Sequence, residues 1–105
     1  YPEKSSNWTN RFQMFATENM WTFILLDSYN GRLWQVQYST QDLDNLFCIP
    51  INKYELVENN ERCIFSIQPL TSMYQYYLIN DNTGDMWKFQ WSTKGDDYRW
   101  IERFR

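Results

Sequence analysis

The sequence MWTFILLDSYNGRLWQVQYST (residues 20–40) recurs in altered form as MYQYYLINDNTGDMWKFQWST (residues 73–93), at an offset of 53 residues. Seven of the 21 aligned positions are identical, where chance gives about one or two. Most of the other positions exchange like for like, as Asp27 does with Asn80 and Tyr38 with Trp91. The chain is therefore predicted to contain two copies of one supersecondary unit of about 50 residues.

Each copy of the repeat predicts a β-hairpin. Apolar and polar residues alternate along 34–39 and again along 87–92, and a period of two is typical of a half-buried strand. Between the strands the two copies read Asp27-x-x-x-Gly31 and Asn80-x-x-x-Gly84. An Asp or Asn side chain accepts a hydrogen bond from the backbone two residues on, and Gly tolerates the positive φ of a turn or bulge. These four residues are therefore assigned to the hairpin turns.

Two further strands are expected in each copy, over 11–15 and 46–49 in the first and over 62–67 and 98–101 in the second. The expected fold is all-β, an antiparallel sandwich or a small barrel built from two copies of the hairpin unit. The aromatic residues in phase with the apolar strand face are expected in the core: Phe23, Trp34, Tyr38, Tyr76, Trp87, Phe89 and Trp91.

The domain organisation follows from the repeat. We expect a flexible lead-in over 1–10 and a single β domain over 11–105, divided into repeat unit one (11–50), a connector (51–61) and repeat unit two (62–105). Because the chain begins Tyr1-Pro2 without Met, we expect a processed product or a cut segment,.

The Leu-Asp-x-x-x-Gly-x-x-Trp stretch at 26–34 resembles the hairpin that recurs in β-propeller blades of the quinoprotein type. It is also similar to small bacterial tandem β-hairpin proteins of unknown function. The likeness covers about 20 residues in each copy, and the second copy departs from it with Ile79-Asn80 in place of Leu-Asp,. The resemblance implies a turn Asp, a bulge Gly and a packing Trp, and it implies no activity and no cofactor. Two copies are too few to close a propeller, which takes at least about four blades.

Composition excludes several classes of function. The 105 residues (13.0 kDa) carry a net charge of −3 and contain no histidine, so triads, zinc sites and pH switches that need an imidazole are excluded,. The acidic balance argues against a nucleic-acid partner, which needs a concentrated basic face. The longest strictly apolar run, at 23–26, is too short to span a membrane,.

The two cysteines, Cys48 and Cys63, leave two alternatives open. They form a disulfide, worth about 3 kcal/mol in the chain-entropy model, or they are separate small apolar residues of the core. The spacing offers no metal motif. The missing Met, the possible disulfide and the absence of helix together favour a secreted, periplasmic or cell-envelope location.

Aromatic residues carry the main functional signal, because Phe, Trp and Tyr make up 20% of the chain. Several of them have no assigned core partner and are the candidate binding residues: Tyr29, Tyr74, Tyr77, Tyr98 and Trp100. Exposed Trp and Tyr bind protein partners as hot spots or stack on sugar rings. The alternative is that they form a second small core or a homodimer face.

The carboxylates give a weaker indication of function than the aromatic residues. Asp42 with Asp44, and Asp96 with Asp97, follow the two hairpins at similar places and suggest calcium binding or acid/base work, but solvated turn residues explain them better,. We therefore expect a non-enzymatic binding module with no catalytic residues, metal or cofactor, whose aromatic face binds a protein partner. A carbohydrate-binding module is the second hypothesis, and a small carboxylate-dependent hydrolase is the third.

Overall fold

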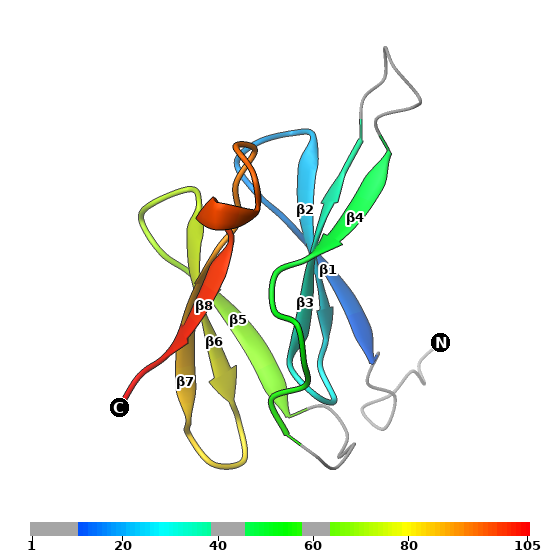
Figure 1. Ribbon diagram of the computed structural model, residues 1–105. Helices are drawn as coiled ribbons and strands as arrows, with labels where there is room; N and C mark the ends of the chain where they lie inside the picture. The colour runs from blue at the N-terminus through cyan, green and yellow to red at the C-terminus, as the bar shows by residue number, and fades with distance from the viewer. Residues whose placement is uncertain (1–10, 39–45, 58–63) are drawn as a thin grey trace.

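Each half of the chain folds into one four-stranded antiparallel sheet (Figure 1). The computed structural model describes residues 11–38, 46–57 and 64–105. The first sheet contains β1 (Phe12–Ala16), β2 (Thr22–Asp27), β3 (Arg32–Gln37) and β4 (Phe47–Pro50), in that order. The second sheet contains β5 (Phe65–Pro69), β6 (Gln75–Asn80), β7 (Met86–Gln90) and β8 (Trp100–Arg103), also in chain order. The expected lead-in over 1–10 lies outside the described residues.

The two sheets have the same register, which confirms that the repeat is structural. Phe12 lies opposite Asp27 in the first sheet, and Phe65 lies opposite Asn80 in the second, 53 residues later. At the other edge Trp34 lies opposite Pro50, and its counterpart Trp87 lies opposite Arg103. One repeat unit is therefore a four-stranded meander.

The hairpin turns have the predicted chemistry. The Asp27 carboxylate accepts the Tyr29 N–H at 3.1 Å, and the Asp27 carbonyl accepts the Gly31 N–H at 2.9 Å. In the second hairpin, the Asn80 side chain accepts the Asn82 N–H at 2.9 Å, and its carbonyl accepts the Gly84 N–H at 2.7 Å. The backbone φ is 81° at Gly31 and 80° at Gly84. Both glycines hold the left-handed conformation that closes the turn.

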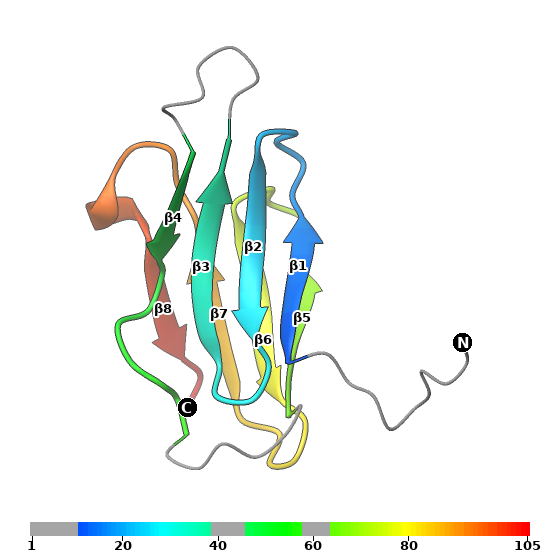
Figure 2. The same ribbon diagram turned by 90° about the vertical axis from the view of Figure 1, so that its right-hand side faces the viewer.

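The two sheets stack face to face (Figure 2), so the fold is a sandwich of two units. One core lies between them and draws residues from both sheets: Ile24, Leu26, Leu33, Ile51, Ile64, Phe65, Tyr76, Leu78, Trp87, Phe89 and Trp91. Within the described residues, helical structure is limited to the 3-10 turn η2 (Asp96–Tyr98), and no helix there is long and apolar enough to cross a membrane.

The prediction of the core was right for the second copy and wrong for the first. Trp87 and Phe89 are buried between the sheets, but their counterparts Trp34 and Val36 lie on the outer side of the first sheet, half-buried. In their place Gln35 points inward and is fully buried. Phe23 and Tyr38 were also expected in the core and are likewise half-buried on the outer side. The reason is that the two copies turn opposite faces toward each other.

Candidate binding surfaces

The outer side of the first sheet is an apolar surface, here called the front face. Side chains alternate along each strand, so all four strands place one set of residues there. The apolar members of this set are Phe12, Met14, Ala16, Phe23, Leu25, Trp34, Val36, Cys48 and Pro50, and Asp27 and Arg32 lie on the same side at one end. Phe12 is 52% exposed and Met14 is 56% exposed, although both lie in β1 beside other apolar side chains. A contiguous exposed apolar surface of this kind typically marks an interaction site.

Ring contacts organise this face from one end to the other. The Phe12 and Trp34 ring centroids lie 6.5 Å apart across β1 and β3. At the opposite end, the Tyr38 ring lies 6.0 Å from the Phe23 ring and 5.4 Å from the Trp21 ring. Aromatic side chains provide a large contact area with few rotatable bonds, so this surface is suited to a protein partner.

Two arginines border the front face. The Arg11 guanidinium lies 5.3 Å from the Phe12 ring centroid, and the Arg32 guanidinium lies 4.9 Å from that of Trp34. Asp27 holds Arg11 through two hydrogen bonds of 2.9 and 3.0 Å. These hydrogen bonds raise the pKa of Arg11 above its ordinary value, so Arg11 remains a cation at this border.

Tyr29, a predicted binding residue, belongs to the same border. It sits in the turn between β2 and β3, half-buried, with the Arg11 guanidinium 4.9 Å from its ring centroid. Tyr29 is therefore occupied by an internal cation–π contact and is less available than Phe12.

Cys48 lies on the front face opposite Val36, on the edge strand β4. Cys48 has no disulfide partner among the described residues, and it is exposed, contrary to the expectation of a core position. Desolvation by burial raises the pKa of the Cys48 thiol above its ordinary value. Cys63 lies outside the described residues, and its pairing with Cys48 stays a prediction.

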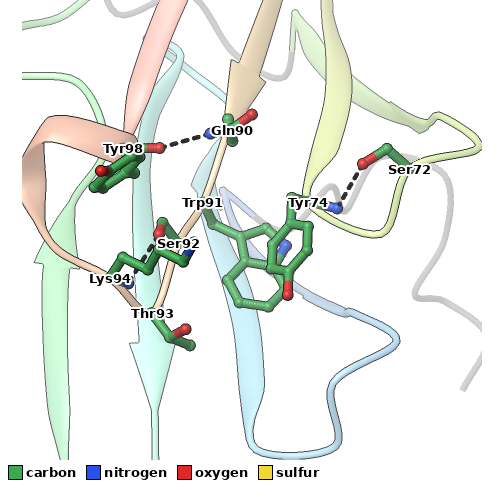
Figure 3. A pocket seen from close by; sticks show the side chains of 8 residues that line it. All are labelled: Ser72, Tyr74, Gln90, Trp91, Ser92, Thr93, Lys94 and Tyr98. Carbon is green, nitrogen blue, oxygen red and sulfur yellow. Dashed lines mark hydrogen bonds between the residues drawn. The ribbon is translucent and has the colours of Figure 1, made fainter.

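Tyr74 and Tyr98 come together at a second place, a shallow hollow of about 190 Å³ (Figure 3). They are 41% and 50% exposed and approach it from opposite sides. Trp91 forms the floor between them, fully buried, with its ring 4.8 Å from that of Tyr74. Ser92, Thr93 and Lys94 add polar groups to the lining. The hollow is smaller than a typical drug-sized ligand pocket.

Tyr77 and Trp100 lie on a third surface, the outer side of the second sheet, here called the back face. Tyr77 packs edge-to-face against Phe104 at 5.6 Å, and Trp100 pairs with Gln90. The sequence placed Tyr77 on the opposite strand face from Tyr76, and this is correct because Tyr76 is buried while Tyr77 is partly exposed. The five predicted aromatic residues are thus spread over three surfaces.

The carboxylates form no shared cleft in the described residues. Asp96 is 2.6 Å from Arg99, and this hydrogen bond lowers the pKa of Asp96. Asp96 is thus an ionised partner of Arg99, and Asp97 beside it is exposed. Asp42 and Asp44 lie outside the described residues.

Comparison with known proteins gave no relative. Searches of protein-family profiles, of curated proteins and of solved structures found no match to this chain. The resemblance to tandem β-hairpin proteins therefore stays a prediction, and function must be argued from the surfaces themselves.

Sequence reasoning missed the front face as a unit. Phe12, Met14, Leu25 and Cys48 were not singled out as binding residues, because each lies in a strand whose apolar residues were assigned to a core. The available signal was β2, where the run 23–26 is apolar on both strand faces. A strand that is apolar on both faces needs a cover on each side.

Proposed function

We propose that this chain is a non-enzymatic binding module whose front face docks a protein partner. The observation that carries the proposal is the half-exposed apolar face of the first sheet, which spans β1 to β4 and places Phe12 and Met14 in solvent. Its chemistry fits a protein partner because aromatic and Met side chains and Arg are enriched at protein interfaces. The predicted location in the cell envelope or outside the cell belongs to the same proposal.

Photo-cross-linking tests the docking function directly. Phe12 is replaced by p-benzoylphenylalanine, which keeps an aromatic ring at a 52% exposed position. The matched control carries the same group at Tyr54, which is 71% exposed in the segment after β4 and outside the front face. We expect a discrete cross-linked species in source-cell extract from position 12 and none from position 54.

A surface charge then tests whether the face itself is responsible. Met14→Glu places a carboxylate on the front face, midway along the edge strand β1, and Met20→Glu places one in the β1–β2 loop at a 67% exposed site. We expect Met14→Glu to abolish the cross-link, since burying an unpaired charge in an apolar interface is costly, and Met20→Glu to leave it intact. No discrete species from position 12 in the unsubstituted background would contradict the proposal.

Carbohydrate binding is the second candidate, and the hollow between Tyr74 and Tyr98 supports it. Two exposed tyrosine rings beside hydroxyl and ammonium groups can stack on a sugar ring and hydrogen-bond its hydroxyls. Native affinity electrophoresis against soluble polysaccharides tests this function. We expect retardation that Tyr74→Ala and Tyr98→Ala remove and Tyr54→Ala does not. Uniform mobility across the panel would exclude this candidate.

A further inference from the structure

The internal interface of the sandwich joins unlike faces of the two repeat units. The first unit contributes the face that carries Ile24, Leu26 and Leu33, while the second contributes the face that carries Leu78 and Phe89. Shifted by the 53-residue repeat, Ile24 corresponds to Tyr77, and Tyr77 lies on the opposite side of its own sheet, away from the core. The contact between the units is therefore heterologous. The inner side of the first sheet packs against the side of the second sheet that corresponds, by the repeat, to the front face.

The front face of the first sheet corresponds to a surface that is covered in the second sheet. Met14, Leu25 and Trp34 correspond to Ile67, Leu78 and Trp87. In the second unit Leu78 and Trp87 are buried and Ile67 packs against the core, because the inner side of the first sheet lies over them. In the first unit the corresponding residues have no such cover among the described residues, and Met14 is 56% exposed.

The back face of the second sheet corresponds to the surface that does this covering. The inner side of the first sheet covers the second sheet with Ile24, Leu26 and Leu33. Their repeat counterparts on the back face are Tyr77, Ile79 and Met86. Ile51, also in the core, corresponds to Phe104, which is 45% exposed. At all four positions the back face has kept an apolar residue. Other positions of the back face are polar: Lys88 stands where the internal interface holds Gln35, Glu102 opposite it stands where the first sheet has Ile49, and Gln68 stands where it has Phe15.

We propose that a second copy of this chain occupies the front face, placing the back face of its own second sheet there, so that copies associate head to tail. The inference rests on the proposed docking function of the front face and names its partner. The occupant is argued from continuity with the internal interface, since the two free faces are the repeat counterparts of the two faces already joined. Such a heterologous contact leaves a free front and a free back on every assembly that does not close into a ring.

Sedimentation velocity on the purified chain tests the association, over about 1 to 500 µM because interfaces of ordinary size reach micromolar affinity. Met14→Glu blocks the front face and Phe104→Glu blocks the back face, both at exposed positions. Met20→Glu is the matched control. Far-UV circular dichroism and a urea midpoint verify that each variant is folded, and Ala16→Glu and Met86→Glu are second variants of the two faces.

Head-to-tail pairing has a distinctive outcome in mixtures. The unsubstituted chain should exceed its 13.0 kDa mass with rising concentration, and each blocked variant alone should associate at least about tenfold more weakly. Mixed in equal amounts, Met14→Glu and Phe104→Glu should form a complex of two chains and stop there, because one supplies an intact back and the other an intact front. Met20→Glu should behave as the unsubstituted chain.

Several results would overturn the inference. A chain that stays at 13.0 kDa at every concentration has no self-association. A Phe104→Glu variant that associates as strongly as the unsubstituted chain would mean that the back face takes no part. A chain that stays single but cross-links a different polypeptide from position 12 overturns the inference and leaves the proposed function standing, whereas a single chain with no cross-link contradicts both.

Discussion

Gln35 is a buried polar side chain that links the two sheets. Its side-chain oxygen accepts the Ser92 N–H at 3.1 Å and an Arg99 guanidinium N–H at 3.3 Å, while its amide nitrogen donates to Gln37. Arg99 in turn donates to the Ser92 carbonyl at 2.8 Å. A buried amide is tolerated in an apolar core only when such partners are present. The surrounding Ser92 and Arg99 come from the other repeat unit, so Gln35 sets how the two units fit.

Replacing Gln35 by leucine should destabilise the fold by about 1–3 kcal/mol, because the buried Ser92 N–H loses its acceptor and Arg99 loses one of its several acceptors,. The free energy of unfolding from urea titration checks this value. Gln68→Leu, an exposed position on β5, is the matched control and should change it by less than about 0.5 kcal/mol,. Equal effects of the two substitutions would show that Gln35 has no special role.

The two turn glycines should differ in their tolerance of a side chain. Both have positive φ, so valine at either position should cost about 1–3 kcal/mol of strain,. At Gly31 an added Cβ would also lie 2.9 Å from Leu56 Cδ1 and 3.1 Å from the Phe65 ring, whereas nothing lies within 4 Å of it at Gly84. Urea midpoints should therefore fall further for Gly31→Val than for Gly84→Val. An unchanged urea midpoint in both variants would contradict a role of these two turn glycines in stability.

At the scale of elements, the second hairpin is tied to the edge strand β8 by an ion pair. The Asp85 carboxylate lies 2.9 Å from the Arg103 guanidinium and accepts a hydrogen bond from the Thr83 hydroxyl at 3.1 Å. The hydrogen bonds from Arg103 and Thr83 lower the pKa of Asp85. Charged side chains on an edge strand also discourage unwanted strand pairing, so β8 gains both a fixed position and a guarded edge.

The lowered pKa of Asp85 predicts a loss of stability in acid. A carboxylate whose pKa is lower in the folded state stabilises the fold above its unfolded pKa, and that contribution disappears as pH falls through the folded pKa. The urea midpoints of the unsubstituted chain and Asp85→Asn should therefore differ near pH 7 and converge near pH 2. Because the pair is exposed, about 1 M salt should shrink the difference. A difference independent of pH would mean that the charge of Asp85 is not involved.

At the scale of the whole molecule, neither sheet has a core without the other. The core cluster takes Ile24, Leu26 and Leu33 from the first sheet and Leu78 and Phe89 from the second. A single four-stranded sheet with one covered face gains its stability by packing on a second layer. The two repeat units should consequently unfold together.

Substitutions in either sheet should shift one common transition. Leu33→Ala and Leu78→Ala remove side chains that are 0% exposed, and each should cost about 2–5 kcal/mol. Tryptophan fluorescence and far-UV circular dichroism should give coincident urea curves for both variants. Leu46→Ala, at 58% exposure, is the control with little effect. Two separate transitions would mean that the sheets fold independently.

The strands, the hairpins and the duplication follow from local features of the sequence. Asp27 with Gly31 and Asn80 with Gly84 specify turns by local chemistry, and strands next to a turn pair with the neighbours that the turn supplies. Local information also separated Tyr76 from Tyr77, since alternation along a strand is a property of the backbone.

Which face of each sheet is buried, and which surfaces remain free, depends on how the two sheets pack against each other. Trp34 and Trp87 hold the same place in the repeat, yet Trp87 is in the core and Trp34 is on the front face. Within the second unit, the fold brought Tyr74 and Tyr98 to one hollow and placed Tyr77 on the back face. In a strand with apolar residues on both sides, the alternation of side chains is the same whichever side is buried, so local sequence does not select the buried side. The choice between its faces is made by the sheet that packs against it, through contacts between residues more than fifty positions apart.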